Sequence, residues 1–198
     1  MRIISGKKRG MKLLPPGTHE TRPITDRAKE ALFSVLYKYD LIEDGCVADL
    51  FSGTGSMGLE SLSRGAKYAT FIEQSPKVVA ILKRNIEKAD FVDESTVIKG
   101  NVFKIGAPVT KDIEKYNLVF VDPPYVMSTN SKEGSRVAKL MLLLNEQIAP
   151  GGLAIVRTHK YSELDDDYGD LKLIDKRKWG TMGVAIYQMQ TEGQADDE

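Results

Sequence analysis

The chain has 198 residues, of which 41% are hydrophobic and 28% are charged, and its formal net charge is zero. These values are typical of a soluble globular protein with one substantial core. No apolar run approaches the roughly 20 residues that a membrane-spanning helix needs, and the single cysteine, Cys46, excludes a disulfide framework. The amino end lacks the apolar segment of a signal peptide, so we expect a cytoplasmic protein with no membrane partner.

Charge is distributed unevenly between the two ends of the chain. The first twelve residues hold five basic side chains and no acidic one, whereas residues 191–198 hold four acidic side chains and no basic one. A basic arm favours contact with a polyanion, although two solvated ends are the simpler interpretation. We predict a basic arm and helix over residues 1–40, a core domain over 41–190 and an acidic flexible tail over 191–198. The basic residues of the arm are Arg2, Lys7, Lys8, Arg9 and Lys12.

The first predicted helix begins after Thr25, a good N-cap residue, and carries Asp26 in its first turn. From Cys46 onward, strand-like and helix-like patterns alternate. The apolar face of the first helix consists of Ala28, Ala31, Leu32, Val35, Leu36 and Tyr39. The predicted strands cover residues 46–51, 68–73, 96–99, 117–122 and 153–156. Three later helices are predicted. One follows the glycines near residue 55, one begins at Ser75-Pro76, and one extends from Val137 to Ile148 and ends before Pro150-Gly151-Gly152.

The last part of the chain departs from the alternation of strands and helices. Residues 171–176 and 184–190 are strand-like, and the link between them is too short for a helix, which indicates a hairpin. Repeated strand–helix units imply a doubly wound α/β fold with right-handed crossovers. We therefore predict a seven-stranded, mainly parallel sheet with a terminal antiparallel hairpin, plus the small N-terminal arm and helix.

The segment from Val47 to Gly58 passes from an apolar run through glycines to a helical pattern. Such a strand–turn–helix is the usual entry to a nucleotide-type cofactor site. Its glycines, Gly53, Gly55 and Gly58, satisfy the spacing of the dinucleotide fingerprint. Glu73 lies 20 residues beyond the first of them, where that fingerprint has its ribose-binding acid. The glycine motif alone therefore leaves the cofactor open.

A polar residue stands at or just after each of the first four predicted strands: Asp49, Glu73, Asn101 and Asp122. Loops are exposed to solvent, which is enough to explain a single polar residue at a strand end. Four such residues beside a glycine turn favour a ligand site at the carboxyl ends of the strands. Asp49 would repel the pyrophosphate of a dinucleotide, whereas it suits the positive sulfonium and ammonium groups of S-adenosylmethionine. We therefore predict S-adenosylmethionine as the cofactor. The histidines and Cys46 form no ligand pattern, and we predict no metal.

The tetrapeptide from Asp122 to Tyr125 predicts chemistry on an aromatic amine. The lone pair of such an amine is delocalised into the ring, so two acceptors must draw its hydrogens out of the plane. The Asp122 carboxylate and the Pro123 carbonyl can do this, and consecutive prolines fix the turn. Tyr125 offers a flat face for an extruded base. A rigid turn after a buried strand is the simpler interpretation of the tetrapeptide alone.

These motifs resemble the S-adenosylmethionine-dependent amino-methyltransferases. The segments that carry the resemblance are Asp49 to Gly55, Gly58-Leu59-Glu60, Ser63 to Ala66 and Asp122 to Tyr125. The N-terminal part is similar to the RsmD family, whose members methylate the N2 amino group of a guanine in bacterial 16S ribosomal RNA. The similar segments there are Arg2 to Gly6, Gly10 to Leu13, Thr21 to Arg27 and Leu32-Phe33.

The resemblance implies a Rossmann-like class I methyltransferase fold and a role for each matching position. It implies base capture by Asp122, Pro123, Pro124 and Tyr125. It implies contacts with S-adenosylmethionine from Arg22, Thr25, Asp49, Phe51, Ser52, Gly53, Gly55, Glu73, Gln74, Asn101 and Val102. It implies RNA contacts from Arg2, Lys7, Lys8, Arg9, Lys12 and Arg27. Three positions depart from the pattern: Asn101 replaces an acid, Tyr125 replaces a phenylalanine, and Arg157-Thr158-His159 brings positive charge to a strand end.

The resemblance thus implies a methyltransferase for the exocyclic N2 amino group of a guanine in 16S ribosomal RNA, acting within an assembling small ribosomal subunit. One alternative is a DNA adenine-N6 or cytosine-N4 methyltransferase, although no insertion is large enough for a target-recognition domain. Another is a non-catalytic assembly factor that binds ribosomal RNA and retains the fold. A NAD-dependent oxidoreductase is the most distant alternative, because Asp49 disfavours a dinucleotide.

Overall fold

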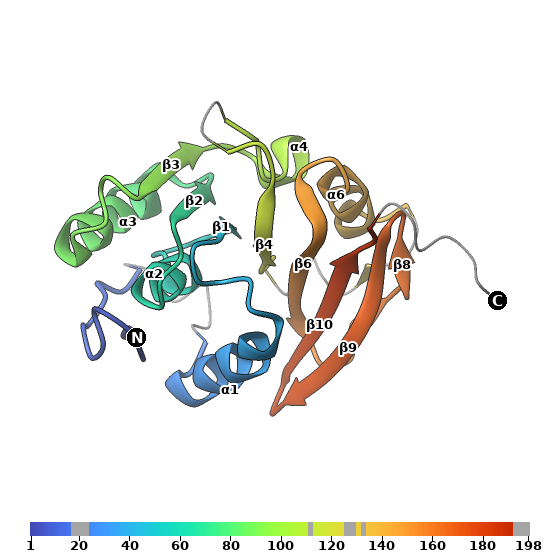
Figure 1. The fold of residues 1–198 in the computed structure, drawn as a ribbon, viewed down its shortest axis with the longest axis horizontal. Helices are drawn as coiled ribbons and strands as arrows, with labels where there is room; N and C mark the ends of the chain where they lie inside the picture. Colours follow the sequence, from blue (N-terminus) through green and yellow to red (C-terminus); the bar gives the residue numbers. More distant parts are fainter. Residues whose placement is uncertain (17–23, 111–112, 125–129, 132–133, 192–198) are drawn as a thin grey trace.

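The computed structural model describes residues 1–16, 24–110, 113–124, 130–131 and 134–191. Its centre is an eight-stranded sheet in the order β3-β2-β1-β4-β6-β10-β9-β8, with helices on both faces (Figure 1). The sheet strands are β1 (Cys46–Leu50), β2 (Tyr68–Glu73), β3 (Ser95–Lys99), β4 (Tyr116–Val121), β6 (Ile148–His159), β8 (Asp167–Tyr168), β9 (Leu171–Trp179) and β10 (Met182–Met189). The helices are α1 (Asp26–Leu36), the 3-10 helix η1 (Tyr37–Tyr39), α2 (Ser56–Ser63), α3 (Pro76–Ala89), α4 (Val102–Ile105) and α6 (Arg136–Leu144).

The pairing of the strands confirms the predicted doubly wound sheet. The first five strands of the order, β3 to β6, pair in parallel, and β10 and β9 continue the sheet antiparallel to their neighbours. All seven predicted strands are present, and the two-residue strand β8 adds an eighth at the edge. A separate small sheet joins β5 (Asn130–Ser131) to β7 (Glu163–Leu164). No helix in the described part of the chain is both long and apolar enough to cross a membrane.

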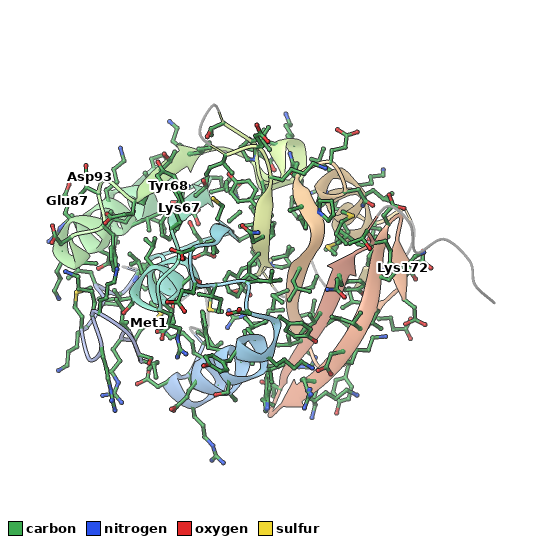
Figure 2. All side chains as sticks on the ribbon, viewed as in Figure 1. Met1, Lys67, Tyr68, Glu87, Asp93 and Lys172 are labelled. Atoms are coloured by element: carbon green, nitrogen blue, oxygen red, sulfur yellow. The ribbon has the colours of Figure 1, made fainter. Side chains whose placement is uncertain are left out.

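Two apolar clusters lie on the two faces of the sheet. The first joins α1, α2 and α3 to Val47, Phe71 and Phe120, and the second joins α4 and α6 to Leu50 and Val121. Alternation along each strand assigns neighbouring residues to opposite faces. Charged side chains, Glu87, Asp93 and Lys172 among them, point outward at the two ends of the sheet (Figure 2).

Local sequence signals explain where several helices begin. The Thr25 hydroxyl accepts a hydrogen bond from Ala28 N and caps α1, as predicted. Pro76 occupies the first turn of α3, where its missing N–H removes no helical bond. The buried face of α1 differs from the predicted one: Leu32 and Leu36 are buried, but Lys29 and Phe33 are buried in place of the two alanines. The Phe33 ring contacts the Phe120 ring of β4 at 5.8 Å between centroids, so this face of α1 packs on the sheet.

The prediction around Pro150 was wrong in its details. Helix α6 ends at Leu144, and Ile148 already pairs with Tyr116 as the start of β6. The glycines after Pro150 lie inside this strand, at an irregularity where the pairing passes from Tyr116 to Leu118. Only glycine fits at position 152, because a Cβ there would lie 2.9 Å from Ala149 O. The bulge therefore accommodates residues that sequence patterns assign to a helix stop.

The N-terminal arm forms a packed hairpin. Ile3 N donates to Met11 O at 2.9 Å, and Gly10 N donates to Ile3 O at 2.9 Å. Gly6 has a φ of +77°, and a Cβ there would lie 1.6 Å from Ser63 O, so no other residue fits against α2. Ile3 is fully buried. The arm and α1 thus share a core with the sheet, while the domain boundaries at 40 and 190 stay predictions and residues 192–198 lie outside the described part.

A buried network of charges anchors this hairpin. Glu60 on α2 is fully buried and accepts bonds from Ile4 N at 2.7 Å and Ser5 N at 3.0 Å. Lys29 Nζ lies 3.0 Å from the same carboxylate, and Arg64 Nε lies 2.8 Å from it. Lys29 also donates to the Arg2 carbonyl at 2.8 Å. Helices α1 and α2 are therefore joined to the arm through one carboxylate whose oxygens are fully hydrogen-bonded.

Candidate active site

The turn between β1 and α2 has the backbone that its glycines predict. Phe51, Gly53 and Gly55 all have positive φ, at 57°, 53° and 88°. Beyond the adjacent residues of the chain, the atom nearest to a Cβ on Gly53 would be Phe51 O at 4.0 Å, so the space over this residue is open. A Cβ on Gly58 would lie 2.3 Å from the Phe71 ring, so this glycine permits close helix–strand packing. The turn can therefore admit a ligand over Gly53.

Asp49, near the end of β1, contacts the first turn of α2. Its carboxylate is 2% exposed and accepts a bond from Gly58 N at 2.9 Å. Burial raises the pKa of Asp49 to about 7, the Asp122 carboxylate adds to the rise, and bonds from the Gly58 and Met57 N–H groups oppose it. Because Asp49 already binds N–H groups at this helix start, they are not available to a pyrophosphate. The geometry thus strengthens the case against a dinucleotide.

Asp49→Asn should change how the stability of the ligand-free protein depends on pH. The pKa of Asp49 is higher in the folded than in the unfolded protein, so its contribution is full below about pH 4 and is lost as pH rises through about 7. Asparagine does not titrate. The free energy of unfolding of the variant, relative to the wild type, should therefore rise between pH 4 and pH 8, by up to about 4 kcal/mol for three pKa units. Urea unfolding at several pH values measures this, and a constant difference would contradict the assignment.

Glu73, at the end of β2, holds the glycine turn from the neighbouring strand. One carboxylate oxygen accepts a bond from Gly53 N at 3.1 Å, and the other accepts one from Ser75 N at 2.8 Å. Each oxygen retains a second lone pair, so a pair of ribose hydroxyls can still donate to this carboxylate. Gln74 beside it is exposed. The predicted ribose-binding acid is therefore beside the turn and half-buried.

Asn101 has a structural task that the sequence did not indicate. Its side-chain oxygen accepts a bond from Phe103 N at 3.0 Å and caps the four-residue helix α4. Asn101 is exposed, whereas the adjacent Val102 is 3% exposed and belongs to the core. Ser52 is also buried. The Phe51 ring contacts the Phe103 ring at 5.2 Å between centroids, which joins the glycine turn to α4.

Asp122, directly after β4, forms an ion pair with Arg157 on β6. Arg157 Nε donates to one oxygen of Asp122 at 2.6 Å, and Nη2 donates to the other oxygen. The register explains the pair, because Val121 lies opposite Val156 and the next residues of the two strands are these. Pro123 is buried and Pro124 is half-buried, whereas Tyr125 lies outside the described residues.

Strand alternation brings the acidic residues of the site together. Asp49, Glu73 and Asp122 each stand two residues after a strand residue that faces α1, α2 and α3, and therefore point to that same face. All three lie at the carboxyl ends of neighbouring parallel strands. Asp49 and Asp122 are close enough to affect each other electrostatically. Sequence reasoning found these three residues but gave Arg157 no role. The pairing of Val121 with Val156, which places Arg157 beside Asp122, is visible only in the structure.

The predicted RNA contacts are spread over the surface. Lys7 N donates to Ser63 O at 2.7 Å, so the tip of the hairpin lies at the end of α2 away from Asp49, about 12 Å along eight helical residues. Arg2 and Lys12 pair at the other end of the hairpin, and Arg2 Nε donates to Asp26 at 2.7 Å. Arg27 is exposed. Arg22 lies outside the described residues, and Lys8 and Arg9 flank the hairpin tip.

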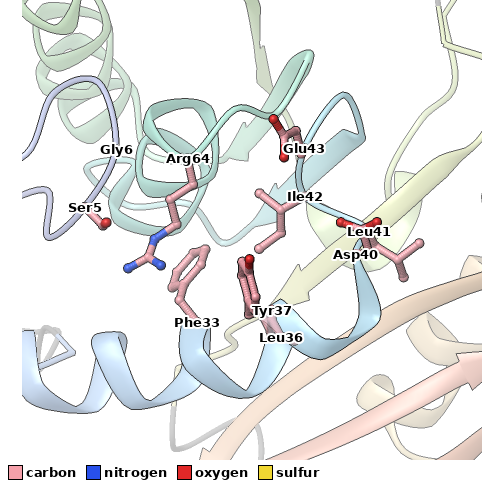
Figure 3. Close-up of a pocket in the computed structure, with 10 residues that line it drawn as sticks. All are labelled: Ser5, Gly6, Phe33, Leu36, Tyr37, Asp40, Leu41, Ile42, Glu43 and Arg64. Carbon is pink, nitrogen blue, oxygen red and sulfur yellow. The ribbon is translucent and has the colours of Figure 1, made fainter.

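A pocket of about 230 Å³ lies elsewhere, between the end of α1 and residues 40–43 before β1 (Figure 3). Phe33, Tyr37, Ile42 and Arg64 are among its lining residues. It lies at the amino edge of the sheet, opposite to the edge that carries the acidic residues. Within the described residues, no group of three or more histidine, cysteine, aspartate or glutamate side chains could hold a metal ion.

Comparison with known proteins agrees with this architecture. The solved structure of the Escherichia coli protein yhhF matches with a TM-score of 0.78 at 30% identity, over 96% of this chain and 98% of that chain. An RNA methyltransferase from Salinibacter ruber, solved in complex with S-adenosyl-L-homocysteine, matches with a TM-score of 0.62 at 19% identity, over 89% of this chain and 99% of that chain. The fold is thus the Rossmann-like fold of class I methyltransferases.

The family follows from the sequence comparisons. The family model described as "Conserved hypothetical protein 95" matches residues 1–188, and the chain belongs to this family. Ribosomal RNA small subunit methyltransferase D of Escherichia coli strain K12 is 31% identical over 99% of this chain and 93% of its own length. The predicted resemblance to the RsmD family is thereby confirmed.

Proposed function

We propose that the protein uses S-adenosylmethionine to methylate the exocyclic N2 amino group of a guanine in 16S ribosomal RNA. The observation that carries the proposal is the grouping of Asp49, Glu73 and Asp122 at neighbouring strand ends on one face of the sheet. The similarity to ribosomal RNA small subunit methyltransferase D supports the choice of substrate. An assembling small subunit as the partner, and the cytoplasm as the location, are further parts of the proposal.

The residues around the glycine turn fit the cofactor. The open space over Gly53 leaves room for its nucleoside, and Glu73 can accept hydrogen bonds from two ribose hydroxyls. The buried carboxylate of Asp49 places negative potential where a cationic ligand is favoured over an anionic one. When bound, S-adenosylmethionine supplies an electrophilic methyl group, and its sulfur keeps the electron pair of the broken bond.

Asp122 and Pro123 would prepare the amine that receives the methyl group. The Asp122 carboxylate and the Pro123 carbonyl accept its two hydrogens, which directs the nitrogen lone pair toward the methyl carbon. The nitrogen uses that lone pair to form the new bond and then loses one proton to solvent or to Asp122. Tyr125 lies outside the described residues, and its role as a flat face for the flipped base stays a prediction from the sequence. Catalysis of this kind consists mainly of positioning and of electrostatic preorganisation.

Mass spectrometry of nucleosides from 16S ribosomal RNA tests the proposal directly. Cells that lack the gene should lose one N2-methylguanosine, and the gene supplied on a plasmid should restore it. Methyl incorporation into small-subunit particles should exceed incorporation into duplex DNA. The opposite order would favour the DNA methyltransferase, and calorimetry without binding of S-adenosylhomocysteine would favour the non-catalytic assembly factor.

Removing charge from the hairpin tip should weaken RNA binding in a salt-dependent way. Lys7 and Arg9 are exposed there, so the combined Lys7→Ala and Arg9→Ala variant loses up to two phosphate contacts. The slope of log affinity against log salt should then decrease by about 1 per contact. The matched control is the combined Lys83→Ala and Arg84→Ala variant, since both residues are exposed on α3. Equal slopes for the two variants would remove the hairpin tip from the RNA interface.

A further inference from the structure

Arg157 presents a planar fork to both oxygens of Asp122. Its Nε donates at 2.6 Å to one oxygen, and Nη2 donates to the other, which is the two-point geometry that only a guanidinium provides. The side chains are 14% and 22% exposed, so water screens the pair only in part. Nη1 lies 4.0 Å from Met182 Sδ on β10, which limits rotation of the guanidinium from the other side.

The ion pair between Arg157 and Asp122 lies close to a third charged group, the carboxylate of Asp49. Asp49 on β1 is near enough to Asp122 for the two carboxylates to repel each other. Burial is the main reason why the pKa of Asp49 is raised, Asp122 adds to the rise, and Arg157 opposes it. Arg157 is therefore the cation that offsets two carboxylates of the site at once. Removing it would leave two like charges in a partly dry environment.

We propose that Arg157 is a positioning residue that fixes the carboxylate of Asp122 in the orientation needed to receive the base amino group. A carboxylate has about four lone-pair sites, and the fork occupies one on each oxygen. Because the guanidinium and the carboxylate are coplanar in a fork–fork pair, the remaining lone pairs have a defined direction. Arg157 thus acts on the reaction through Asp122 and does not touch the reacting atoms. The proposal rests on the function proposed above.

The position of Arg157 in the fold supports a role beyond stability. Opposite residues on neighbouring parallel strands hold the two partners at the carboxyl edge, where ligands bind in open α/β sheets. A second forked pair, between Arg177 and Asp175, lies on β9, two strands away from Arg157, because Val184 of β10 pairs with Arg157 on one side and with Arg177 on the other. Its arginine is 46% exposed, and its carboxylate does not belong to β1, β2 or β4. The chain thus contains a pair of the same chemistry outside the proposed site, which provides a matched control.

Arg157→Lys is the decisive variant, because lysine keeps the charge but offers a point donor in place of the fork. We expect kcat for methylation of small-subunit RNA to fall about 10- to 100-fold. The Kd of S-adenosylhomocysteine, measured by calorimetry, should change less than about threefold, and KM for the RNA should change little. Arg177→Lys should leave all three values within twofold of the wild type.

A double-mutant cycle with Asp122→Asn then separates positioning from other roles. If Arg157 acts through the carboxylate, adding Arg157→Lys to the Asp122→Asn variant should lower kcat by less than twofold further. A full additional loss in that background, or a single variant with wild-type kcat, would overturn the proposal. An inactive wild type in the same assay would instead refute the proposed function. Thermal melting of each variant, expected within a few degrees of the wild type, excludes misfolding as the cause.

Discussion

Asp122→Ala is expected to lower kcat for methyl transfer by about 10²–10³-fold while the Kd of S-adenosylhomocysteine stays within about threefold. The reason is that the carboxylate would act on the amine and not on the cofactor. It follows β4, whereas the glycine turn and Glu73 belong to β1 and β2. Single-turnover measurement of methyl transfer to small-subunit RNA, together with calorimetry, separates the two effects.

Alanine also leaves Arg157 without its partner, so a second variant is needed. Asp122→Asn keeps the size and one acceptor oxygen while it removes the negative charge. A loss of kcat in both variants indicates that the charge itself is required. Wild-type turnover in Asp122→Ala would remove Asp122 from the mechanism, and a parallel loss of cofactor binding would reassign it to the cofactor site.

Lys29→Ala is expected to lower the free energy of unfolding by about 3–5 kcal/mol, because it removes one partner of a buried ion pair. Lys29 and Glu60 are both fully buried, with 3.0 Å between Nζ and the carboxylate. The variant would leave Glu60 with Arg64 as its remaining cation. Urea unfolding followed by circular dichroism measures the change.

The exposed pair between Lys172 and Asp167 provides the control for this prediction. Its side chains are 49% and 62% exposed, so Lys172→Ala should change the free energy of unfolding by less than about 1 kcal/mol. Hydrogen exchange adds a local measure: the Ile4 and Ser5 amides, which donate to Glu60, should exchange faster in Lys29→Ala. Equal losses of stability in the two variants would contradict the assigned importance of the buried network.

The sheet was largely predictable because its strands are short apolar runs separated by strong turn and helix signals. Residues 68–73 were predicted as a strand, and β2 has these bounds. The glycines also predicted the tight turn between β1 and α2, since Gly53 and Gly55 have positive φ there, whereas the residue type of Phe51 carries no signal for its own positive φ. By contrast, β5, β7 and β8 have two residues each and leave no period in a sequence.

The features that were missed depend on contacts between distant segments. Lys29 was not assigned to the buried face of α1, because its burial depends on Glu60, which follows 31 residues later. The pair between Asp122 and Arg157 depends on strand register, which a pattern of apolar residues does not fix for adjacent polar positions. Asn101 was predicted to contact the cofactor, and its capping bond to Phe103 N depends on a helix of one turn.

The attachment of the hairpin has a consequence for shortened versions of the protein. Deleting residues 1–13 would remove two N–H donors from the Glu60 carboxylate and the Arg2 carbonyl from Lys29, and it would leave hollows where Ile3 and Leu13 were. The N-terminal hairpin is therefore part of the hydrophobic core and of the buried charge network, in addition to carrying positive charge. A truncation made to study RNA affinity would also lower the melting temperature, so point substitutions at the hairpin tip test RNA binding without this loss of stability.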